Sequence, residues 1–594
     1  MASGEALFGV TRSFGGKAWR LKPADDRIAG EIARAAGVSD ALARLLASRG
    51  LTAEEAPGFL APRLRDSFPD PSSFLGMDGC AALIWDAMER GERIALFADY
   101  DVDGATSAAQ LHRWLKQAGE PPLIYVPDRI EEGYGPNAQA FESLKAQGAG
   151  LVLTLDCGAA SVEPLAAAAG MGLTVGVVDH HLMSGKPPEA AALVNPNQPG
   201  CASGCGHLAA AGVTFVLLAA LNREGRRRGA FKGRAEPDLM ALADLAALGT
   251  ICDVVPLTGV NRAIVATGLK VMSAWRNPGL AALAEVAGVT GEATPYHAGF
   301  LLGPRINAGG RVGRADLGAR LLTTEDPGEA RRIAEELDVL NAERRAIEAE
   351  VLKGAMEQVE AAGIDPETPV LIAAGNHWHP GVIGIAAGRV KERFNRPSLV
   401  IGIDPETGLA KGSGRSCPGV DLGSAVSRAR EAGVLLAGGG HAMACGLTVQ
   451  RERIGELRDF LQAELAAQWA AAEEARSYAV DAVVHPAAVS FEFCDALSAA
   501  APFGMGNPEP RFAFSDMKRT YAQRVGSDHV RFAFEARSGA RLSGIAFRIA
   551  DDPAGQALLA PGEAWFHAAG KLKADDSRFG KRAELHLEDL AEAG

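Results

Sequence analysis

Three carboxylates lie at alternate positions in the segment ADYDVDG, residues 98–104. Asp99, Asp101 and Asp103 could hold a cation, because carboxylate oxygens are common ligands of Ca²⁺, Mg²⁺ and Mn²⁺. A calcium loop of the EF-hand type also begins D-x-D-x-D-G, but its twelfth position carries a bidentate Glu, and here that position is Gln110. The preceding residues 94–97 are all apolar and predict a buried strand rather than an incoming helix. The pattern therefore favours carboxylates at the end of a strand over a calcium loop.

Acidic and histidine residues also follow two other short apolar runs. Asp156 follows one run, and the sequence Asp179-His180-His181 follows another. The carboxyl ends of parallel strands meet at one edge of a sheet, so we expect these side chains to lie together. Crowded carboxylates repel and raise each other's pKa, which makes a bound cation the expected partner. A single strand-end Asp is more often a turn or cap residue, and only the coincidence of several strand ends favours a metal site.

Asp253, in the segment ICDVVP, adds a further carboxylate to this set. An oxygen-rich site with one or two imidazoles suits Mn²⁺ or Mg²⁺ better than Zn²⁺, and the number of ligands is enough for two ions. Two such ions roughly 3.5–4 Å apart can support in-line attack at phosphorus. The predicted chemistry is metal-assisted hydrolysis of a phosphoester or phosphoanhydride.

A second set of candidates is cationic and lies in glycine-rich segments. Guanidinium and hydroxyl groups next to accessible backbone N–H groups are suited to binding phosphate, although each segment alone also fits a glycine turn with a solvated side chain. The candidate substrate-binding residues are Arg129, Arg305, Asn307, Arg311, Ser413, Arg415 and His441.

The composition is that of an ordinary globular protein, with 594 residues, 47% hydrophobic and 22% charged. This length predicts several domains. The net charge of −13 gives no support for a polyanion partner but does not exclude one, because local fields steer ligands. No signal peptide or membrane span is expected, and eight cysteines in so long a chain predict reduced thiols in the cytoplasm. The cluster Cys201, Cys205 and His207 lacks a fourth zinc ligand, and an ordinary loop is favoured there.

Hydrophobic periodicity predicts helices near the N-terminus, with caps at Ser39 and Thr52. Short apolar runs then alternate with amphipathic stretches, which predicts a largely parallel sheet covered on both faces. Pro327 and Gly363 frame one long connecting helix. A second α/β pattern follows, and alternating strands with Gly and Asp turns predict a small C-terminal β-barrel or sandwich. The predicted divisions are an N-terminal helical region at 1–80, a catalytic α/β domain at 81–260, a helical connector at 261–363, a second α/β domain at 364–474 and a β-domain at 475–594.

The C-terminal region interleaves cations with aromatic residues, as single-stranded nucleic acid requires. Alternating Phe residues in a small barrel are more often core than a stacking surface, so the cations are the stronger indication. The cations are Arg511, Lys518, Arg519, Arg524, Arg531, Arg537 and Arg541, and the aromatic residues are Phe512, Phe514, Tyr521, Phe532 and Phe534.

The segments ADYDVDG, DCG, DHH, ICDVVP, GPRINAGGR, GSGRS and GGHAMACG occur in an order that resembles the DHH phosphoesterase superfamily. Within it, the chain is most similar to bacterial exonucleases that degrade single-stranded DNA from the 5′ end. The resemblance extends over nearly the whole chain, including LNAERR and PFGMGNPEPRF. It implies a DHH domain, a helical connector, a DHH-associated domain and an OB-fold. The chain departs from the family pattern at Ala98, where a glycine is usual, and at Ala159, where DCGI is usual, and neither change removes a ligand.

The resemblance also implies roles for single residues. Asp156 would bridge two manganese ions, and Asp101, Asp103, His180 and Asp253 would complete the coordination. Asp99 is included among the metal residues. It could bind an ion directly or hydrogen-bond to a residue that does, and both alternatives stay open. The residues implied to handle substrate phosphates are His181, Arg129, Arg305, Ser413, Arg415 and His441.

The leading hypothesis is a 5′→3′ exonuclease on single-stranded DNA that acts in repair and recombination. One alternative is a DHH phosphodiesterase for short oligonucleotides or cyclic dinucleotides, which generally lacks an OB-fold. Another is a non-catalytic DNA-binding scaffold, which the complete ligand set disfavours. By resemblance alone, the expected partners are single-stranded DNA, a helicase and single-strand-binding protein, the protein is expected to be a monomer, and manganese is favoured over magnesium.

Overall fold

The computed structural model describes every residue except 1–4, 130, 184, 578, 579 and 594. The chain forms two compact units. One contains Leu64–Glu474, and the other combines Met1–Arg63 with Ala475–Gly594. No helix in the described part of the chain combines the length and apolar character that crossing a membrane requires.

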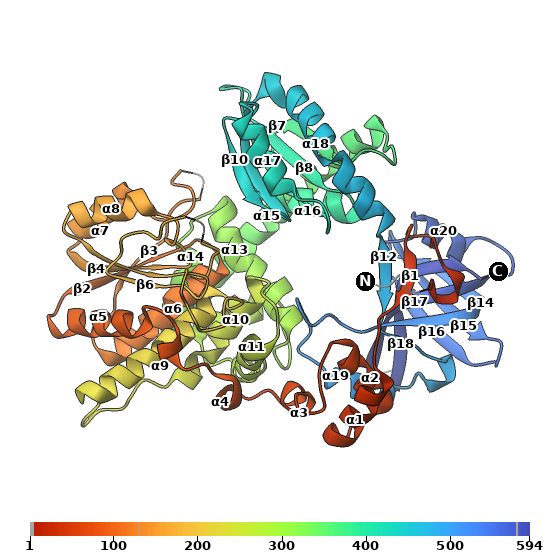
Figure 1. Cartoon of the computed structure of the whole chain (residues 1–594), viewed down its shortest axis with the longest axis horizontal. Helices are drawn as coiled ribbons and strands as arrows, with labels where there is room; N and C mark the ends of the chain where they lie inside the picture. Colours follow the sequence, from red (N-terminus) through yellow and green to blue (C-terminus); the bar gives the residue numbers. More distant parts are fainter. Residues whose placement is uncertain (1–4, 130, 184, 578–579, 594) are drawn as a thin grey trace. The chain divides into compact units, whose positions relative to one another are not determined.

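A five-stranded, fully parallel sheet forms the first part of the Leu64–Glu474 unit. Its order is β3 (Leu123–Tyr125), β2 (Arg93–Ala98), β4 (Ala149–Leu155), β5 (Thr174–Val178) and β6 (Ala192–Val194). Figure 1 shows helices α5 (Met77–Glu89), α6 (Val102–Ala118) and α9 (Ala210–Arg228) on one face, and α7 (Ala138–Ala146) and α8 (Val162–Gly170) on the other. The parallel sheet covered on both faces is as predicted. Because the strand order reverses between β2 and β4, the loops after these strands flank a crevice suited to ligand binding.

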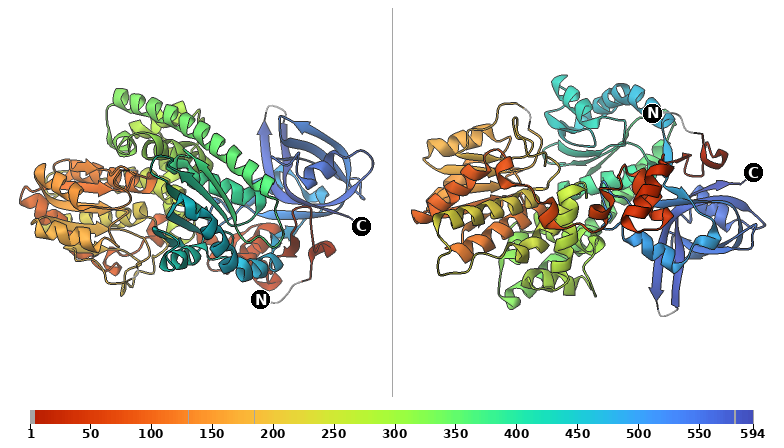
Figure 2. Two further views of the ribbon diagram at one scale, coloured as in Figure 1. Left: turned by 90° about the horizontal axis from the view of Figure 1, so that it is seen from above. Right: turned by 60° about the horizontal axis from the view of Figure 1, so that its bottom comes forward.

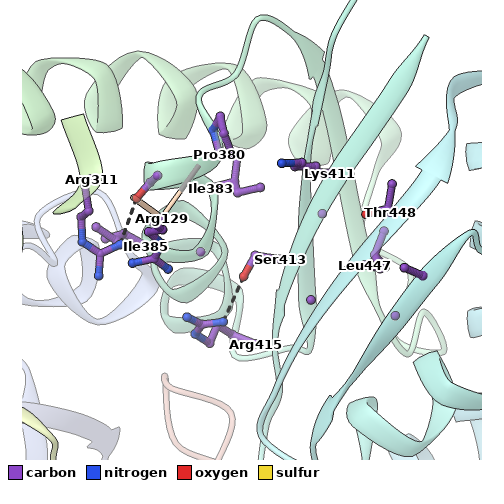
Figure 3. Close-up of a pocket in the computed structure, with 16 residues that line it drawn as sticks. Arg129, Arg311, Pro380, Ile383, Ile385, Lys411, Ser413, Arg415, Leu447 and Thr448 are labelled. Carbon is purple, nitrogen blue, oxygen red and sulfur yellow. Dashed lines mark hydrogen bonds between the residues drawn. The ribbon is translucent and has the colours of Figure 1, made fainter. Parts of the chain in front are cut away.

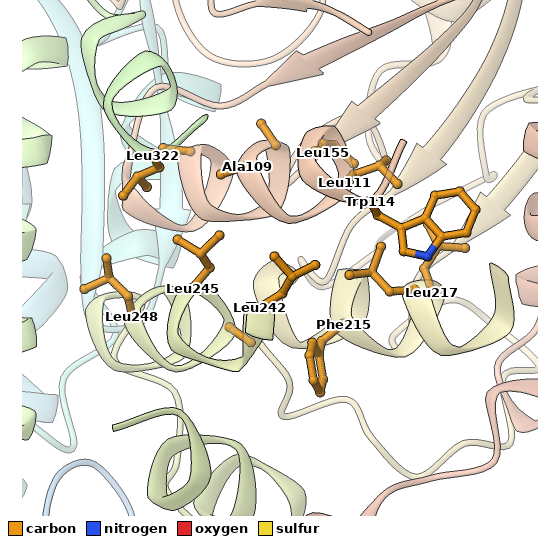
Figure 4. Close-up of a cluster of buried hydrophobic side chains, with 14 of the residues drawn as sticks. Ala109, Leu111, Trp114, Leu155, Phe215, Leu217, Leu242, Leu245, Leu248 and Leu322 are labelled. Carbon is orange, nitrogen blue, oxygen red and sulfur yellow. The ribbon is translucent and has the colours of Figure 1, made fainter. Parts of the chain in front are cut away.

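A helical core fixes the position of the loop that carries Asp253. Helix α10 (Ala243–Cys252) packs against α6 and α9, with Trp114, Leu217 and Leu245 among the buried contacts (Figure 4). A Cβ at Gly249 would lie 2.4 Å from Thr106 Oγ1, so glycine at this position lets α10 approach α6 closely. The C-terminal end of α10 is thereby held next to the N-terminal turn of α6. Helices α11 (Gly259–Met272) and α12 (Pro278–Val286) extend this core.

The connector is helical, as predicted. A π-helix, η4 (His297–Leu302), runs directly into α13 (Gly303–Val312), and α14 (Leu317–Thr323) precedes the long helix α15 (Pro327–Ala362), which is visible as one unbroken rod in Figure 2. Asp326 caps α15 by accepting a hydrogen bond from the Gly328 N–H. Pro327 at the first position and Gly363 at φ 71° bound α15 as the sequence indicates.

A second, mixed sheet completes this unit. Its order is β10 (Ala437–His441), β11 (Ala444–Gln450), β9 (Leu409–Arg415), β8 (Ser398–Ile403) and β7 (Leu371–Asn376). Only the β7–β8 pair is parallel, and β8 and β9 form the hairpin predicted through DPETG. The helices associated with it are α16 (Pro380–Phe394), α17 (Leu422–Glu431) and α18 (Ile454–Glu474).

The C-terminal β-domain is a closed five-stranded barrel. Its strands are β14 (Arg511–Val525), β15 (His529–Ala536), β16 (Arg541–Ala546), β18 (Gly580–Glu592) and β17 (Trp565–Ser577), and pairing of β14 with β17 closes the barrel. Helices α19 (Phe491–Ser498) and α20 (Pro553–Leu559) accompany it. The OB-fold implied by the resemblance is therefore present. Each of these five strands therefore has a partner on both sides over at least part of its length.

Residues 5–63 fold onto the barrel domain rather than forming a region of their own. Strand β1 (Ala18–Leu21) pairs in parallel with β12 (Ser477–Val480). Helices α1 (Asp26–Ala36), α2 (Asp40–Ser48) and α3 (Ala56–Leu60) contribute to the same hydrophobic core as the barrel. The predicted cap at Ser39 is present. Thr52 also caps its segment, because its Oγ1 accepts from the Glu55 N–H at 3.3 Å while Glu55 Oε2 accepts from the Thr52 N–H at 2.9 Å, and α3 begins directly after Glu55. The boundary predicted near residue 80 differs from this arrangement, because local periodicity does not reveal which distant segment a helix packs against.

Candidate metal centre and substrate cavity

Two carboxylates of the ADYDVDG segment are fixed by backbone N–H groups at helix N-termini. Asp101 is the N-cap of α6, and its Oδ1 accepts hydrogen bonds from the N–H groups of Asp103 and Gly104 at 2.9 and 3.1 Å. Asp103 accepts from the first two N–H groups of α9, at Ala210 (2.7 Å) and Ala211 (2.8 Å). These bonds orient both carboxylates. Because residues 102–118 are helical, the segment is not a calcium loop, and Gln110 instead donates from within α6 to the Ala211 carbonyl.

Asp156 follows β4 and is 3% exposed. Its φ of 61° lies in the left-handed region, which is rare for a residue with a Cβ and is retained where the surrounding structure holds it. The Tyr134 hydroxyl donates to the Asp156 backbone carbonyl at 3.1 Å. This backbone conformation places the Asp156 carboxylate 3.3 Å from His180 Nε2 and 3.9 Å from His181 Nδ1.

Asp179, at the end of β5, organises the histidine pair. Its carboxylate accepts from the N–H groups of Ala159 (2.9 Å), His180 (2.7 Å) and His181 (3.2 Å), and from His181 Nδ1 (2.8 Å). Burial alone would raise the pKa of Asp179, but these hydrogen bonds and the charge of His181 lower it. Asp179 was absent from the predicted site residues. Its position at the end of a strand, directly before two histidines, was the signal available in the sequence.

His180 presents an unprotonated nitrogen to the carboxylates. Its Nδ1 donates to the Leu208 carbonyl at 2.9 Å, which leaves Nε2 with a lone pair facing Asp156, Asp253 (3.6 Å) and Asp103 (3.8 Å). Burial lowers the pKa of His180 to about 4 and keeps the ring neutral. Burial also acts to lower the pKa of His181, but its hydrogen bond to Asp179 raises that pKa overall.

The carboxylates and imidazoles form three overlapping groups whose ligand atoms lie within 4.8 Å of one another. Asp156 belongs to two of the groups and His180 to two. The groups are Asp156 with His180 and His181, Asp103 with His180 and Asp253, and Asp99 with Asp101 and Asp156. The residues predicted from the strand ends therefore converge, and Asp156 has the central position.

Buried polar atoms at this centre lack hydrogen bonds. Asp99 Oδ1, Asp156 Oδ1 and His180 Nε2 are all buried without a partner. Buried polar groups are normally satisfied. Asp156 shares one candidate ligand group with His180 and another with Asp99, so these unpaired acceptors fit cations held in the two groups. The donor set of carboxylate oxygens and imidazole nitrogen fits Mn²⁺ or Mg²⁺.

The electrostatics of the metal-free cluster point the same way. Burial and neighbouring carboxylates raise the pKa of Asp103 and of Asp156 well above their usual range. Burial and Asp101 raise the pKa of Asp99 to about 8 and that of Asp253 to about 7. Carboxylates buried this close together are stable only when protons or cations are bound to them.

A cavity of about 380 Å³ in the same unit is lined by cations, the first turn of α16 and strands β9 and β11. Arg129, Arg311, Ser413 and Arg415 all line it, as Figure 3 shows. Arg415 Nη1 donates to Ser413 Oγ at 3.2 Å, and Arg311 Nη1 donates to the Gly381 carbonyl at 2.9 Å. Burial, Arg129 and Arg344 lower the pKa of Arg311 to about 10. Crowded guanidinium groups next to a helix N-terminus are suited to a phosphate group.

The cavity adjoins the carboxylate cluster through Tyr100. The Arg129 guanidinium lies 4.9 Å from the centroid of the Tyr100 ring, and Tyr100 stands between Asp99 and Asp101 in the chain. A Cβ at Gly310 would lie 3.0 Å from the Tyr100 carbonyl oxygen, so glycine there allows α13 to pack against this loop. Lys411, two positions before Ser413 on β9, also lines the cavity and was missed, although strand alternation could have indicated it.

Three predicted substrate residues do not line this cavity. Arg305 donates to Asp338 Oδ1 at 2.8 Å and to the Leu301 carbonyl, so its guanidinium joins α13 to α15. Asn307 is half-buried on α13, and His441 is exposed at the end of β10. Cys201, Cys205 and His207 belong to none of the candidate metal groups found among the described residues, and both thiols are hydrogen-bonded to Ser203.

The barrel shows which of its aromatic and basic residues are accessible. Phe512, Phe514, Phe532 and Phe534 are at most 2% exposed and form the core, whereas Tyr521 is 46% exposed. Five of the seven cations form ion pairs: Arg511 with Glu588, Lys518 with Glu563, Arg524 with Asp551, Arg537 with Asp516 and Arg541 with Glu535. Arg519 binds the carbonyls of Ala557 and Leu558. The cations are therefore a weaker indication of nucleic-acid binding than the sequence suggested, because nearby carboxylates neutralise much of their charge.

Three family models match the chain in the order of its domains. The DHH family, N-terminal domain, matches residues 93–250, the DHHA1 domain matches 367–467 and the RecJ OB domain matches 480–589. The single-stranded-DNA-specific exonuclease RecJ of Dickeya dadantii is 37% identical over 530 residues, which cover 87% of this chain and 90% of the relative. The chain belongs to the RecJ family. RecJ of Bacillus subtilis is 35% identical over 578 residues, which cover 96% of this chain and 70% of the relative.

Solved RecJ structures have the same fold. RecJ from Thermus thermophilus in complex with Mn²⁺ superposes with a TM-score of 0.79 at 30% identity, covering 96% of this chain and 79% of that one. The Mg²⁺ complex of RecJ from the same organism gives a TM-score of 0.73 at 29% identity, covering 97% and 78%. These RecJ structures hold the divalent ions predicted from the donor set.

Proposed function

We propose that this protein is a metal-dependent exonuclease that hydrolyses single-stranded DNA from its 5′ end. The observation that supports the proposal most strongly is that Asp99, Asp156 and His180 each hold an unpaired buried acceptor within overlapping candidate ligand groups, beside a cavity lined by guanidinium groups. The RecJ relatives are named as single-stranded-DNA-specific exonucleases. Their similarity over most of the chain favours this function over a phosphodiesterase for cyclic dinucleotides.

Two divalent ions, Mn²⁺ or Mg²⁺, would be held by Asp99, Asp101, Asp103, Asp156, His180 and Asp253. When bound, the ions polarise the scissile phosphodiester and lower the pKa of the attacking water. Asp103 and His180 are aimed by hydrogen bonds to α9 and to the Leu208 carbonyl, so the ligands are already oriented in the metal-free protein.

His181 has a different role in this proposal. Its Nδ1 proton is held on Asp179 at 2.8 Å, its pKa is raised, and 44% of its side chain is exposed. Because the pKa of His181 is raised, this partly exposed imidazole takes up a proton more readily than an ordinary histidine. In its protonated form it can donate to a phosphate oxygen and stabilise charge that develops during hydrolysis.

The guanidinium-lined cavity supports recognition of a terminal phosphate, which in the proposed function is the one at the 5′ end. A terminal phosphate carries more negative charge than an internal diester, and the cavity offers Arg129, Arg311 and Arg415 with the Ser413 hydroxyl. Holding that phosphate next to the metal centre would place the first linkage of the strand for cleavage.

We further propose that the barrel domain contributes to binding longer strands, that the enzyme acts in DNA repair and recombination in the cytoplasm, and that it is a monomer. A helicase and single-strand-binding protein are the proposed partners. The charge pairing on the barrel leaves Tyr521 and the exposed Arg531 as its candidate contacts among the residues named above.

A nuclease assay with Mn²⁺ tests the proposal directly. Single strands labelled at either end, blunt duplexes and dinucleotides are the substrates. The expected result is mononucleotide release from the 5′ end of single strands, with blunt duplexes resistant. Preferential cleavage of dinucleotides would favour the phosphodiesterase, and DNA binding without cleavage would favour the scaffold.

A further inference from the structure

Two aromatic side chains are unusually exposed on the unit that carries the metal centre. Tyr296 is 60% exposed and Phe300 is 70% exposed. Their rings stack with centroids 5.4 Å apart and an interplanar angle of 21°. Leaving two large aromatic faces in water has no benefit for folding, so an exposed pair of this kind indicates a binding surface.

The helical element that carries the pair also packs next to the metal centre. Phe300 lies on the π-helix η4, and Tyr296 directly precedes it. On the inner side of η4, Ala298 and Leu302 are fully buried, and the Cys252 thiol lies 3.6 Å from the Ala298 carbonyl oxygen. Cys252 ends α10 and directly precedes Asp253. A π-helix is rare and is often found at functional sites.

The same helical segment also reaches the cation-lined cavity. Without a break, η4 continues into α13, whose last turn carries Arg311. Phe300 and Arg311 are eleven positions apart, which corresponds to roughly 16 Å along a helix. Asn307 lies one turn before Arg311 on the same side of α13. One continuous helical element therefore carries the exposed aromatic pair, contacts Cys252 next to Asp253, and reaches the cavity.

We infer that Tyr296 and Phe300 form a stacking platform for nucleobases of the single strand whose 5′ end occupies the cavity. This inference rests on the proposed nuclease function and adds a reason for its preference for single strands. Aromatic rings stack on any base and so bind without sequence preference. Bases in a duplex are already paired and stacked, so they are not available to the platform. An exposed aromatic pair in continuity with a cation-lined cavity fits this occupant better than it fits a protein partner.

The test compares substitutions that remove the stacking faces with substitutions that keep them. The double variant Tyr296→Ala/Phe300→Ala removes both rings, and the matched control Tyr296→Phe/Phe300→Tyr keeps two aromatic faces. Both positions are exposed, so neither variant disturbs the core, and the thermal midpoint of each verifies this. The substrates are a long 5′-phosphorylated oligothymidylate, a dinucleotide, and the long strand with single abasic sites placed at successive positions.

The expected result is a loss confined to the long strand. The double alanine variant should raise KM for oligothymidylate roughly ten- to hundredfold, as loss of base stacking typically does, with kcat unchanged. Hydrolysis of the dinucleotide should be unaffected, and the control variant should behave as the wild type. Wild type should bind strands with an abasic site at one or two particular positions more weakly, and the double variant should not distinguish them.

Two results would overturn the inference. Equal losses on dinucleotide and long strand would mean that the pair supports the metal centre through η4. Unchanged KM for the long strand, or abasic sites that weaken the variant as much as the wild type, would mean that bases do not stack there and that the patch serves a protein partner. Absence of nuclease activity in the wild type would instead reject the proposed function. Binding affinities for the strands with abasic sites would still test the stacking platform in that case.

Discussion

His180 Nε2 lies 3.3 Å from Asp156 Oδ1, and both atoms are buried without a hydrogen bond. Two buried acceptors facing each other at this distance repel, because neither has a proton to share when Asp156 is ionised and His180 is neutral. A cation bound to both atoms would convert this repulsion into two coordination bonds. The ionised form of Asp156 is therefore disfavoured until a cation is bound, which agrees with its raised pKa.

Replacing Asp156 with Asn keeps the shape of the side chain and removes its charge. Because Asp156 belongs to two of the candidate ligand groups, we expect loss of both metal ions and a fall in activity of more than about a hundredfold, since the metals contribute several kcal/mol to catalysis. The metal-free variant should be at least as thermally stable as the metal-free wild type, because carboxylate repulsion is relieved. Calorimetric titration with Mn²⁺ and a thermal melt measure both effects. Retention of a tenth of the activity at saturating Mn²⁺ would contradict the two-metal arrangement.

Stability and metal binding should depend on pH in opposite directions. In the metal-free protein, burial and Asp101 raise the pKa of Asp253 to about 7 and that of Asp99 to about 8, from ordinary values near 4. Between about pH 4 and pH 7–8, the folded protein binds protons that the unfolded chain has released. The free energy of unfolding of the metal-free protein therefore falls as pH rises through this range. Mn²⁺ must displace those protons and binds more tightly as pH rises.

Thermal melts with and without Mn²⁺ check this dependence. The increase in Tm caused by a fixed Mn²⁺ concentration should be larger at about pH 8 than at about pH 6. Titrations in two buffers of different ionisation enthalpy should show net proton release. An equal Mn²⁺ effect at both pH values would mean that the carboxylates are already ionised in the metal-free protein.

Arg415→Ala should reveal recognition of the 5′ end. Arg415 lines the cavity and contacts Ser413, and a charge-assisted hydrogen bond contributes about 1.5–3 kcal/mol. The expected cost is roughly ten- to hundredfold on 5′-phosphorylated strands and much less on strands with a 5′-hydroxyl. The measurement compares kcat/KM for both ends in wild type and variant.

Arg305→Ala is the matched control for Arg415→Ala. Its guanidinium is held by Asp338 and the Leu301 carbonyl, so we expect both end chemistries to lose activity by one common factor, together with a lower Tm. If Arg415→Ala also lowers activity on both ends equally, this arginine binds an internal phosphate. Arg129 and Arg311 are then the next candidates.

Truncation should show that the two ends of the chain fold as one unit. Buried Asp589 accepts hydrogen bonds from Ser13 Oγ at 2.6 Å, from Trp19 Nε1 at 2.9 Å and from the Gly15 N–H at 3.2 Å. Deleting residues 475–594 alone exposes the apolar side of α1 and α2, so we expect an aggregation-prone product. Deleting 1–63 as well should give a soluble protein that hydrolyses short oligonucleotides but binds long strands weakly and with a reduced salt dependence.

Comparison of the two truncated proteins by size-exclusion chromatography and nuclease assay checks this prediction. A monodisperse product from the single deletion would mean that residues 1–63 fold without the barrel. Equal losses on short and long substrates in the double deletion would mean that the barrel unit supports the metal centre.

The sequence by itself was sufficient for the fold class, the long helix and the convergence of the acidic residues. Each of these follows from local periodicity and a general rule: apolar runs that alternate with amphipathic stretches build a parallel sheet, and such a sheet gathers the residues that follow its strands. Asp101, Asp156 and His180 could be placed at one edge because their position relative to the strands determines where they go.

The tertiary structure decided which charged and aromatic groups are free to act. Arg305 and most of the barrel cations looked like phosphate ligands, yet carboxylates and carbonyls from other parts of the chain bind them. Asp179 became part of the site through four hydrogen bonds, three of them to the neighbouring histidines. Tyr296 and Phe300 carry no motif, and only their exposure next to α10 distinguishes them. Which charged groups form ion pairs and which side chains are buried depends on residues far apart in the chain, and the local sequence does not specify those neighbours.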